Sequence, residues 1–138
     1  MSLFNIFNIS GSAMSAQSVR LNTTASNLAN AQNVGSDEAS TYHARQPVFS
    51  SVMQSLQRND TASVGVKVDD IVESQVPLGK RYQPDNPKAD DQGFVFLPNV
   101  NTMDEMANMI SASRSYQSNV EVLNTSKQLM LATLRLGQ

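Results

Sequence analysis

Apolar side chains recur at helical spacing along the first thirty residues. They share one face of a helix: Leu3, Phe7, Met14, Leu21, Ala25 and Leu28. Four of them are seven residues apart, and a repeat of seven is typical of a helix that packs along another helix. The pattern predicts an amphipathic helix of roughly 27 residues, about 40 Å long. The Asn-rich stretch after it and Gly35 favour turn and left-handed conformations, so we assign residues 1–34 to an N-terminal axial helix and its end.

The middle of the chain, residues 35–101, has a different pattern. All five prolines of the protein fall in it, which makes a long helix improbable there. Val64, Val66 and Val68 alternate with small or charged residues, as in a half-buried strand, and "GFVFLP" is a second β-like run. The proline-containing stretch "YQPDNPKADDQG" between them predicts a turn-rich loop. We therefore expect a small β-rich insert with long loops.

The last zone, residues 102–138, reads as a second axial helix. Thr102 and Glu105 have the spacing of a capping box, and Asp104 and Glu105 suit the positive end of the helix dipole. Arg135 falls in the last turn and Gly137 follows it, as is usual at a helix end. The predicted helix has about 35 residues and a length near 52 Å.

The second helix carries two apolar lines. The main face has a seven-residue repeat with flanking positions: Met106, Met109, Ser113, Tyr116, Val120, Leu123, Met130 and Leu134. Val122, Leu129 and Leu136 form a narrower line on the opposite side. One face can pack on the N-terminal helix and the other needs a different partner. The predicted fold is mainly α, with the long terminal helices paired as an α-helical coiled coil and a small β-rich insert between them.

Composition narrows the choice of function. Only 16% of the residues are charged, against roughly 25% in soluble domains, and Ser, Asn, Gln and Thr take their place. Such side chains can be covered by a partner without the cost of burying ions. The net charge of −2 argues against nucleic acid or an anionic membrane as the main partner. The absence of cysteine excludes disulfides and thiolate metal sites.

The sequence shows neither a membrane span nor a cleaved secretory signal. No run approaches the ~20 apolar residues that a spanning helix needs. The start, "MSLFNIFNIS", lacks a basic region followed by a continuous apolar one. We expect that a route without a cleaved signal peptide carries the protein out of the cytoplasm, if it leaves.

Candidate chemistry is sparse. His43 is the single histidine, and a lone histidine in a loop is most often a surface residue. The acidic stretch "DNPKADDQG" lacks the spacing of a calcium loop and is better explained as a solvated turn. Motifs for nucleophilic catalysis, phosphate binding and dinucleotide binding are absent. We predict no catalytic residue, no cofactor and no metal site.

Two motifs in order resemble the axial proteins of the bacterial flagellum, the basal-body rod proteins among them. The N-terminal helix ends in "ASNLANAQNVG", and the C-terminal helix carries "EMANMISASRSYQSNVEVLNTSKQLMLATLRLG". The resemblance also includes the stretch before the last helix and covers nearly the whole chain. It is weakest over residues 36–60, and the conformation of that loop is left open.

The resemblance implies a structural function. Such proteins are exported through the flagellar type III apparatus without a cleaved signal and assemble helically into a hollow drive shaft. A subunit of the proximal rod lies in the periplasm and contacts copies of itself, other proximal rod proteins, the export-gate adaptor and the membrane-supramembrane ring. The shaft conducts exported subunits, transmits torque and is required for swimming motility.

Matching positions in the two motifs imply an assembly role for a set of residues. Together with the apolar repeat of the first helix, the predicted assembly interface consists of Phe7, Met14, Leu21, Ala25, Asn27, Leu28, Ala29, Asn30, Glu105, Met106, Met109, Ile110, Arg114, Tyr116, Asn119, Val120, Leu123, Met130 and Leu134. The apolar members are expected to fill helix seams. The polar members Asn27, Asn30, Arg114 and Asn119 are candidates for intersubunit hydrogen bonds that set the register.

Two other functions remain open at this point. One is a helical adaptor or chaperone of a type III secretion apparatus, which would bind a single partner through a helix groove. The other is a wall-lytic enzyme of the periplasm. The second is disfavoured because Glu105 is expected to cap a helix and Glu121 to face solvent, which leaves no pair of facing carboxylates.

Overall fold

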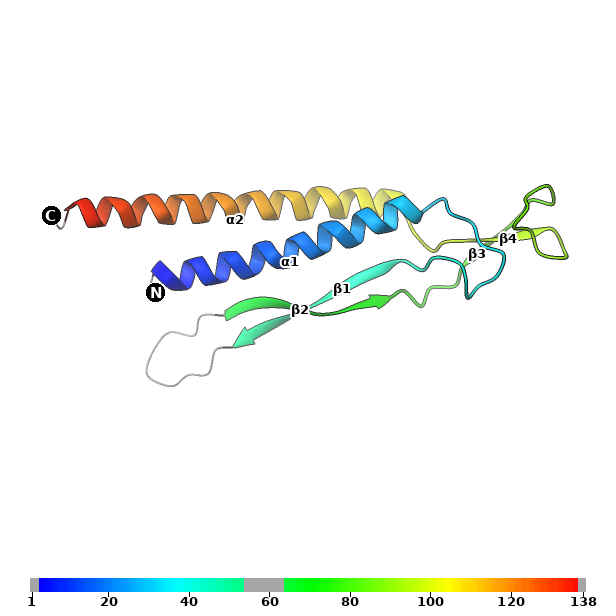
Figure 1. Ribbon diagram of the computed structural model, residues 1–138, viewed down its shortest axis with the longest axis horizontal. Helices are drawn as coiled ribbons and strands as arrows, with labels where there is room; N and C mark the ends of the chain where they lie inside the picture. Colours follow the sequence, from blue (N-terminus) through cyan, green and yellow to red (C-terminus); the bar gives the residue numbers. More distant parts are fainter. Residues whose placement is uncertain (1–2, 54–63, 137–138) are drawn as a thin grey trace.

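The computed structural model describes residues 3–53 and 64–136 and consists of two long helices with two small sheets between them (Figure 1). The elements follow in the order α1 (Leu3–Asn30), β1 (Arg45–Met53), β2 (Val64–Glu73), β3 (Gly79–Tyr82), β4 (Phe94–Leu97) and α2 (Thr102–Leu136). The predicted fold class is confirmed: the two terminal helices pack together, and each sheet has two strands.

The molecule is elongated, with three layers. The helices run antiparallel, and α1 lies between α2 and the β1–β2 hairpin (Figure 1). Helix α1 has 28 residues and α2 has 35, which corresponds to lengths of about 42 and 52 Å at 1.5 Å per residue. The C-terminal end of α2 therefore projects beyond the start of α1.

The strands that the alternation predicts are present, and two strands, β1 and β3, were missed. Val64, Val66 and Val68 lie in β2, and "FVFL" forms β4. Strand β1, which pairs antiparallel with β2 and shifts register between Val48 and Phe49, was not predicted. It contains Pro47, which cannot donate a hydrogen bond to the ladder. In a two-stranded sheet every strand is an edge, and an edge strand tolerates proline.

Gly35 has a different function from the one that we expected. Helix α1 ends at Asn30, and Gly35 instead forms an antiparallel bridge with Phe96 of β4, each backbone N–H donating to the other's carbonyl at 3.0 Å. Its φ angle is not in the left-handed region, where Gly93 alone falls among the described glycines. Glycine is required because a Cβ at this position would collide with the Thr41 hydroxyl. The bridge joins the end of α1 to the β3–β4 sheet.

The cap of α2 lies one residue earlier than predicted. The Met103 N–H donates to Asn101 Oδ1 at 3.1 Å, and Asn101 Nδ2 donates to the Asp104 carboxylate at 2.7 Å. Asn101 is thus the N-cap and Asp104 the reciprocal residue. The predicted pair of Thr102 and Glu105 is wrong in this respect, because Asn caps as well as Thr and the capping-box pattern does not distinguish the two starts. Glu105 therefore does not take part in the cap of α2.

Candidate assembly surfaces

The contact between the helices is built from small and polar side chains. On α2 the buried positions are Glu105, Ala112 and Ser126, and on α1 Ser10 and Thr24 are buried. Among the described elements α2 packs against α1 only, so the burial of Ala112 and Ser126 is due to α1. Ala112 is 0% exposed. Small side chains let two helix backbones approach closely, and the monomer therefore pairs its helices while covering their larger side chains only in part.

The main predicted apolar face of α2 flanks this contact instead of forming its centre. Met109, Leu123 and Met130 are half-buried, whereas Tyr116 is 37% exposed. The most deeply buried line is Glu105, Ala112 and Ser126, whose members are also spaced by multiples of seven. The sequence left open which apolar line of α2 meets α1. The main face flanks the contact, and smaller residues form its centre. A sequence pattern based on large apolar residues does not detect a buried line made of Glu, Ala and Ser.

Leu134 shows what the unequal helix lengths leave uncovered. It lies fourteen residues, about four turns, beyond half-buried Val120 and so on the same side of α2. Nevertheless, Leu134 is 64% exposed, because α1 does not extend that far. Leu129 and Leu131 nearby are exposed as well. We call the exposed C-terminal part of α2, residues 129–135, the overhang.

A second exposed apolar surface lies near the start of α2. Met103, Met106 and Ile110 are separated by three and four residues, which places them on one face of the helix, and all three are exposed. We call this surface the outer patch. Val122 on the predicted narrow line is also exposed, and the side chain of Leu136 lies outside the described residues. Clustered large apolar side chains at a surface mark interaction sites more often than scattered ones do.

Asn27 joins α1 to strand β1 inside the chain. It is 1% exposed. Its Nδ2 donates to the Arg45 carbonyl, and its Oδ1 accepts from both the Arg45 N–H and the Tyr42 hydroxyl, each at 2.9 Å. The side-chain amide thus pairs with the Arg45 backbone as a neighbouring strand would. We predicted an intersubunit hydrogen bond for Asn27, and the structure uses its donor and its acceptor within the subunit.

The other polar residues of the predicted interface make local contacts. Asn30 Nδ2 donates to the Ser26 carbonyl and Asn119 Nδ2 to the Ser115 carbonyl, each at one helical turn. Arg114 is exposed. The remaining predicted positions on α1 differ in burial: Phe7, Met14, Leu21 and Leu28 are half-buried, while Ala25 and Ala29 are exposed. Within one subunit, the half-buried residues are partly covered by neighbouring elements, and the exposed ones are left free.

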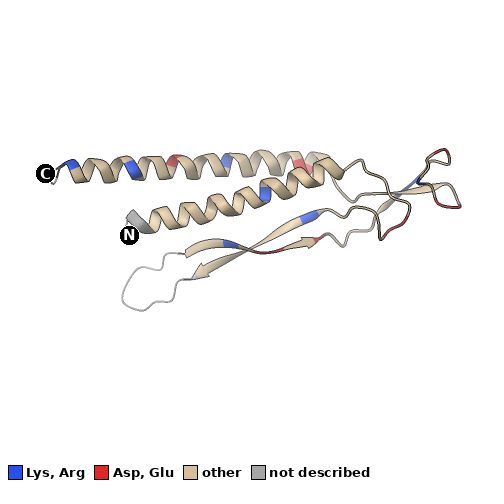
Figure 2. Cartoon of the chain, viewed as in Figure 1, with Lys and Arg blue, Asp and Glu red and all other residues tan. Residues whose placement is uncertain are grey.

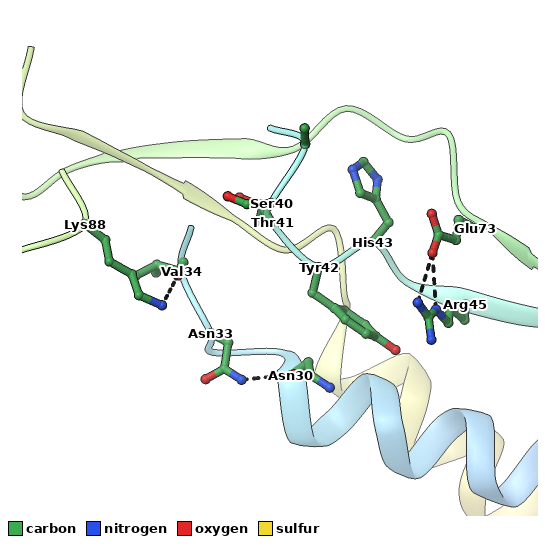
Figure 3. Close-up of a pocket in the computed structure, with 11 residues that line it drawn as sticks. Asn30, Asn33, Val34, Ser40, Thr41, Tyr42, His43, Arg45, Glu73 and Lys88 are labelled. Carbon is green, nitrogen blue, oxygen red and sulfur yellow. Dashed lines mark hydrogen bonds and ion pairs between the residues drawn. The ribbon is translucent and has the colours of Figure 1, made fainter. Parts of the chain in front are cut away.

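Beside the end of α1, residues 39–43 line a polar cavity of about 530 Å³ together with Arg45 and Glu73 (Figure 3). Arg45 forms an ion pair with Glu73 at 3.1 Å, and Lys88 Nζ donates to the Val34 carbonyl at 3.0 Å. Nδ1 of half-buried His43 lies 3.3 Å from the Ser74 carbonyl. Burial raises the pKa of the Tyr42 hydroxyl above its usual value. These contacts occupy the charged groups and hold the loop against the sheet.

Charged residues are thinly spread along both helices (Figure 2). Arg20 is the charged residue of α1, and it donates to Asn108 Oδ1 of α2 at 2.9 Å. Within residues 3–53 and 64–136, three or more potential metal ligands do not gather at any point. Neither helix combines the length and the hydropathy that a membrane span requires.

Comparison with known proteins identifies the family from both ends of the chain. Residues 7–35 match the family described as "Flagella basal body rod protein". Residues 91–136 match the one described as "Flagellar basal body rod FlgEFG protein C-terminal". The first match covers most of α1 and the turn to Gly35, and the second covers β4 and α2. The two segments that pack together in space are therefore the two that define the family.

Curated relatives match over their entire length. The flagellar basal-body rod protein FlgC of Escherichia coli O6:H1 is 54% identical over 138 residues, which is 100% of both chains. The FlgC protein of Salmonella typhimurium is 53% identical over the same span. That of Buchnera aphidicola subsp. Acyrthosiphon pisum is 43% identical over 141 residues, again with both chains fully covered. The chain belongs to the flagellar basal-body rod protein FlgC family, a structural and not an enzymatic family.

Proposed function

We propose that this chain forms part of the wall of the proximal rod, where neighbouring subunits cover the outer patch and the overhang of α2. Family membership makes the protein a structural rod subunit that assembles with other rod subunits. The observation that supports the proposed interface is the distribution of side chains on α2. The most deeply buried positions of α2 are small or polar residues, and eight large apolar side chains remain exposed. A helix that keeps its apolar area for a partner is suited to polymerisation.

The predicted interface residues fit this assignment to different degrees. Met106, Ile110, Tyr116 and Leu134 are exposed and available to neighbours. Asn27 and Glu105 are buried, so we expect them to influence assembly indirectly, through the conformation of the subunit. We assign direct intersubunit contact to the exposed set and to the exposed side of the half-buried set.

We propose the finer location and the partners on the basis of the rod assignment. The subunit lies in the part of the rod that spans the periplasm, reaches it through the flagellar type III apparatus without a cleaved signal peptide, and contacts the export-gate adaptor and the membrane-supramembrane ring at the base. The low density of charge along both helices supports a lining that lets unfolded cargo pass. The assembled wall transmits torque through the packed helices.

A deletion and complementation experiment tests this function. A strain that lacks the gene is expected to build no rod beyond the base and not to swim in soft agar, and the intact chain restores both. Purified basal bodies, examined by electron microscopy and by antibody against this chain, show whether it is in the rod. Normal rods in the deletion strain contradict the proposal. A soluble one-to-one complex with one export protein, and no chain in basal bodies, would instead support the adaptor or chaperone function.

A further inference from the structure

Both sheets of this protein have two strands, so each strand has one edge that no other strand covers. Along such an edge the backbone N–H and C=O groups of every second residue point away from the ladder and need another partner. On β2 this edge is covered within the subunit. The Val66 N–H donates to the Ser12 hydroxyl at 3.2 Å, and the Ile71 N–H donates to the Asp70 carboxylate at 2.7 Å.

The edge of β4 is covered as well. The Phe94 N–H donates to the Asp90 carboxylate, and the Phe94 carbonyl accepts from the Asp90 N–H, each at 2.8 Å. Phe96 exchanges backbone hydrogen bonds with Gly35. Of the strands that the structure describes, β2 and β4 therefore have edges that the subunit itself closes.

The edge of β1 is open over its middle. Asn27 covers the outward backbone groups of Arg45 at the start of the strand. Ser51 also points outward, because its partner Val66 does, and Phe49 lies at the alternate position between them. Within residues 3–53 and 64–136, no hydrogen bond reaches the outward N–H and C=O groups of Phe49 and Ser51. Charged side chains often protect an open edge, and β1 has none after Arg45.

The edge of β3 is the second open one. Lys80 is the partner of outward-pointing Phe96, so its N–H and C=O point away from β4, as do those of Tyr82. All four residues of β3 are exposed, and no hydrogen bond among the described residues involves these outward groups. Edge lysines usually discourage pairing, but Lys80 Nζ lies over the Phe96 ring, 4.7 Å from its centroid. The Lys80 charge therefore leaves the edge accessible.

The two open edges lie on different parts of the elongated molecule. Strand β1 runs beside α1, whereas β3 lies beyond the helices, toward the end opposite the two termini (Figure 1). A cavity of about 400 Å³, lined by Pro47, Phe49 and Glu105 among others, leaves space next to β1. A contact between different surfaces of two copies is head-to-tail, and such contacts build rings and helical filaments, as a rod requires.

Charge favours one alignment of the two edges. If they pair antiparallel with Phe49 opposite Lys80 of the second copy, Val48 lies opposite Arg81. Val48 is paired with Asp70 inside the subunit, so Arg81 comes to the side of Asp70. Both charged residues are exposed, and neither belongs to an ion pair among the described residues. This alignment gives each of them a partner.

The neighbouring alignments are shifted by two residues, since outward residues must face outward residues. One shift places Arg81 beside Ser50, whose partner within the hairpin is Lys67. Like charges on neighbouring strands are unfavourable. The opposite shift sets Tyr82 against Arg45, whose outward backbone groups are already bonded within the subunit.

We propose that the open edge of β1 binds strand β3 of a second copy, which gives a sheet in the order β2–β1–β3–β4 across two subunits. The proposal rests on the function proposed above and adds to it a specific intersubunit contact. The Phe49 and Lys80 backbones exchange hydrogen bonds, and the Tyr82 N–H donates to the Pro47 carbonyl. Main-chain hydrogen bonds provide the affinity, and the charges of Arg81 and Asp70 set the register.

Cysteine crosslinking tests the contact directly, because the natural chain has no cysteine. Val48→Cys and Arg81→Cys are produced as two separate, differently tagged copies of the protein in one deletion strain, so that only an intersubunit disulfide can join them. Arg81→Cys removes the charge and keeps the main-chain hydrogen bonds. After mild oxidation of cells with assembled rods, a dimer that carries both tags is expected on a non-reducing gel.

Val52→Cys with Arg81→Cys is the matched control. Val52 is 40% exposed and Val48 is 41% exposed, and both lie on β1. Four residues of a strand span about 13 Å, which is beyond the reach of a disulfide. The control pair is therefore expected to remain monomeric, as is each single variant produced alone.

Proline substitution tests the main-chain hydrogen bonds. Lys80→Pro removes the outward N–H of β3 and leaves the ladder to β4 intact, because that N–H points away from β4. It is expected to abolish swimming, whereas Lys80→Ala, which keeps the N–H, should swim as the natural chain does. Circular dichroism of the purified variants shows whether they fold. Normal swimming with Lys80→Pro contradicts the proposal, and if this variant does not fold, the crosslinking pair, which keeps Lys80, decides.

The outcomes separate this inference from the rod function. If the complemented strain builds rods and swims but no Val48–Arg81 dimer forms, the rod function holds and the proposed pairing is wrong. A dimer from Val48→Cys alone, or an equal yield with Val52→Cys, also overturns it, because β1 would then pair with another β1 or in another alignment. A Val48–Arg81 dimer without a Val52–Arg81 dimer, together with loss of swimming for Lys80→Pro and not for Lys80→Ala, supports it.

Discussion

Helices α1 and α2 are both long and amphipathic but differ in what covers them. Eight of the exposed large apolar side chains lie on α2, and none of them lies on the described side chains of α1. Helix α1 has neighbours on two sides, α2 and the β1–β2 hairpin, whereas α2 has α1 alone among the described elements. The difference shows that α1 holds the elements of the subunit together, whereas α2 carries the exposed apolar side chains that neighbouring subunits can contact. Substitutions on the two helices should therefore affect different measurements.

The largest loss of stability is expected from Asn27→Ala on α1. The substitution leaves the Arg45 N–H, the Arg45 carbonyl and the Tyr42 hydroxyl without their partner, and each buried unsatisfied group costs about 1 to 3 kcal/mol. Urea unfolding measures the loss as a lower midpoint. Asn22→Ala, at an exposed position of the same helix, is the control. Equal midpoints for the two variants would show that Asn27 does not anchor the hairpin.

Ala112→Leu tests the inner side of α2. A larger side chain at a fully buried position forces the helices apart, which costs about 1 to 3 kcal/mol in the free energy of unfolding. Ala107→Leu adds the same atoms at an exposed position of α2 and is expected to change stability by less than about 0.5 kcal/mol. If Ala112→Leu leaves the free energy of unfolding unchanged, the helices do not approach closely at this position.

Asn101→Ala removes the cap of α2 and is expected to cost about 1 kcal/mol. Thr102→Ala should cost less than about 0.5 kcal/mol, since the first helical residue does not cap. Amide hydrogen exchange in the first turn of α2 separates the two cases, because it rises when the cap is lost. Faster exchange in the Thr102 variant and not in the Asn101 variant would restore the capping box that the sequence predicted.

Ile110→Ser, on the outer patch, is expected to change the stability of the subunit least, by under about 0.5 kcal/mol. Its effect should appear in assembly, as fewer rods and a smaller swimming ring, because neighbours lose an apolar contact. Gln117→Ser, seven residues farther along the same side, is the control. Normal motility with Ile110→Ser would argue that the outer patch faces the water-filled channel or solvent.

The sequence located the two helices and much of the insert. Local signals were sufficient for the extent of α2, because a run of helix-compatible residues and a terminal arginine lie within it. They failed for the edge strands β1 and β3, and for Gly35, whose requirement comes from Thr41 packed against it. The burial of Glu105 was also missed, since its spacing in the first turn matched a capping role.

The sequence by itself determined the family, the lengths of the helices and the scarcity of charge, because these depend on residues that are near one another or simply counted. The tertiary structure alone decided which side of α2 meets α1, that Asn27 holds β1, and that Glu105 faces a cavity. Helical periodicity gives the direction of a side chain around its own axis. It does not give the distance to the next helix, and that distance is set by the small side chains that allow close approach.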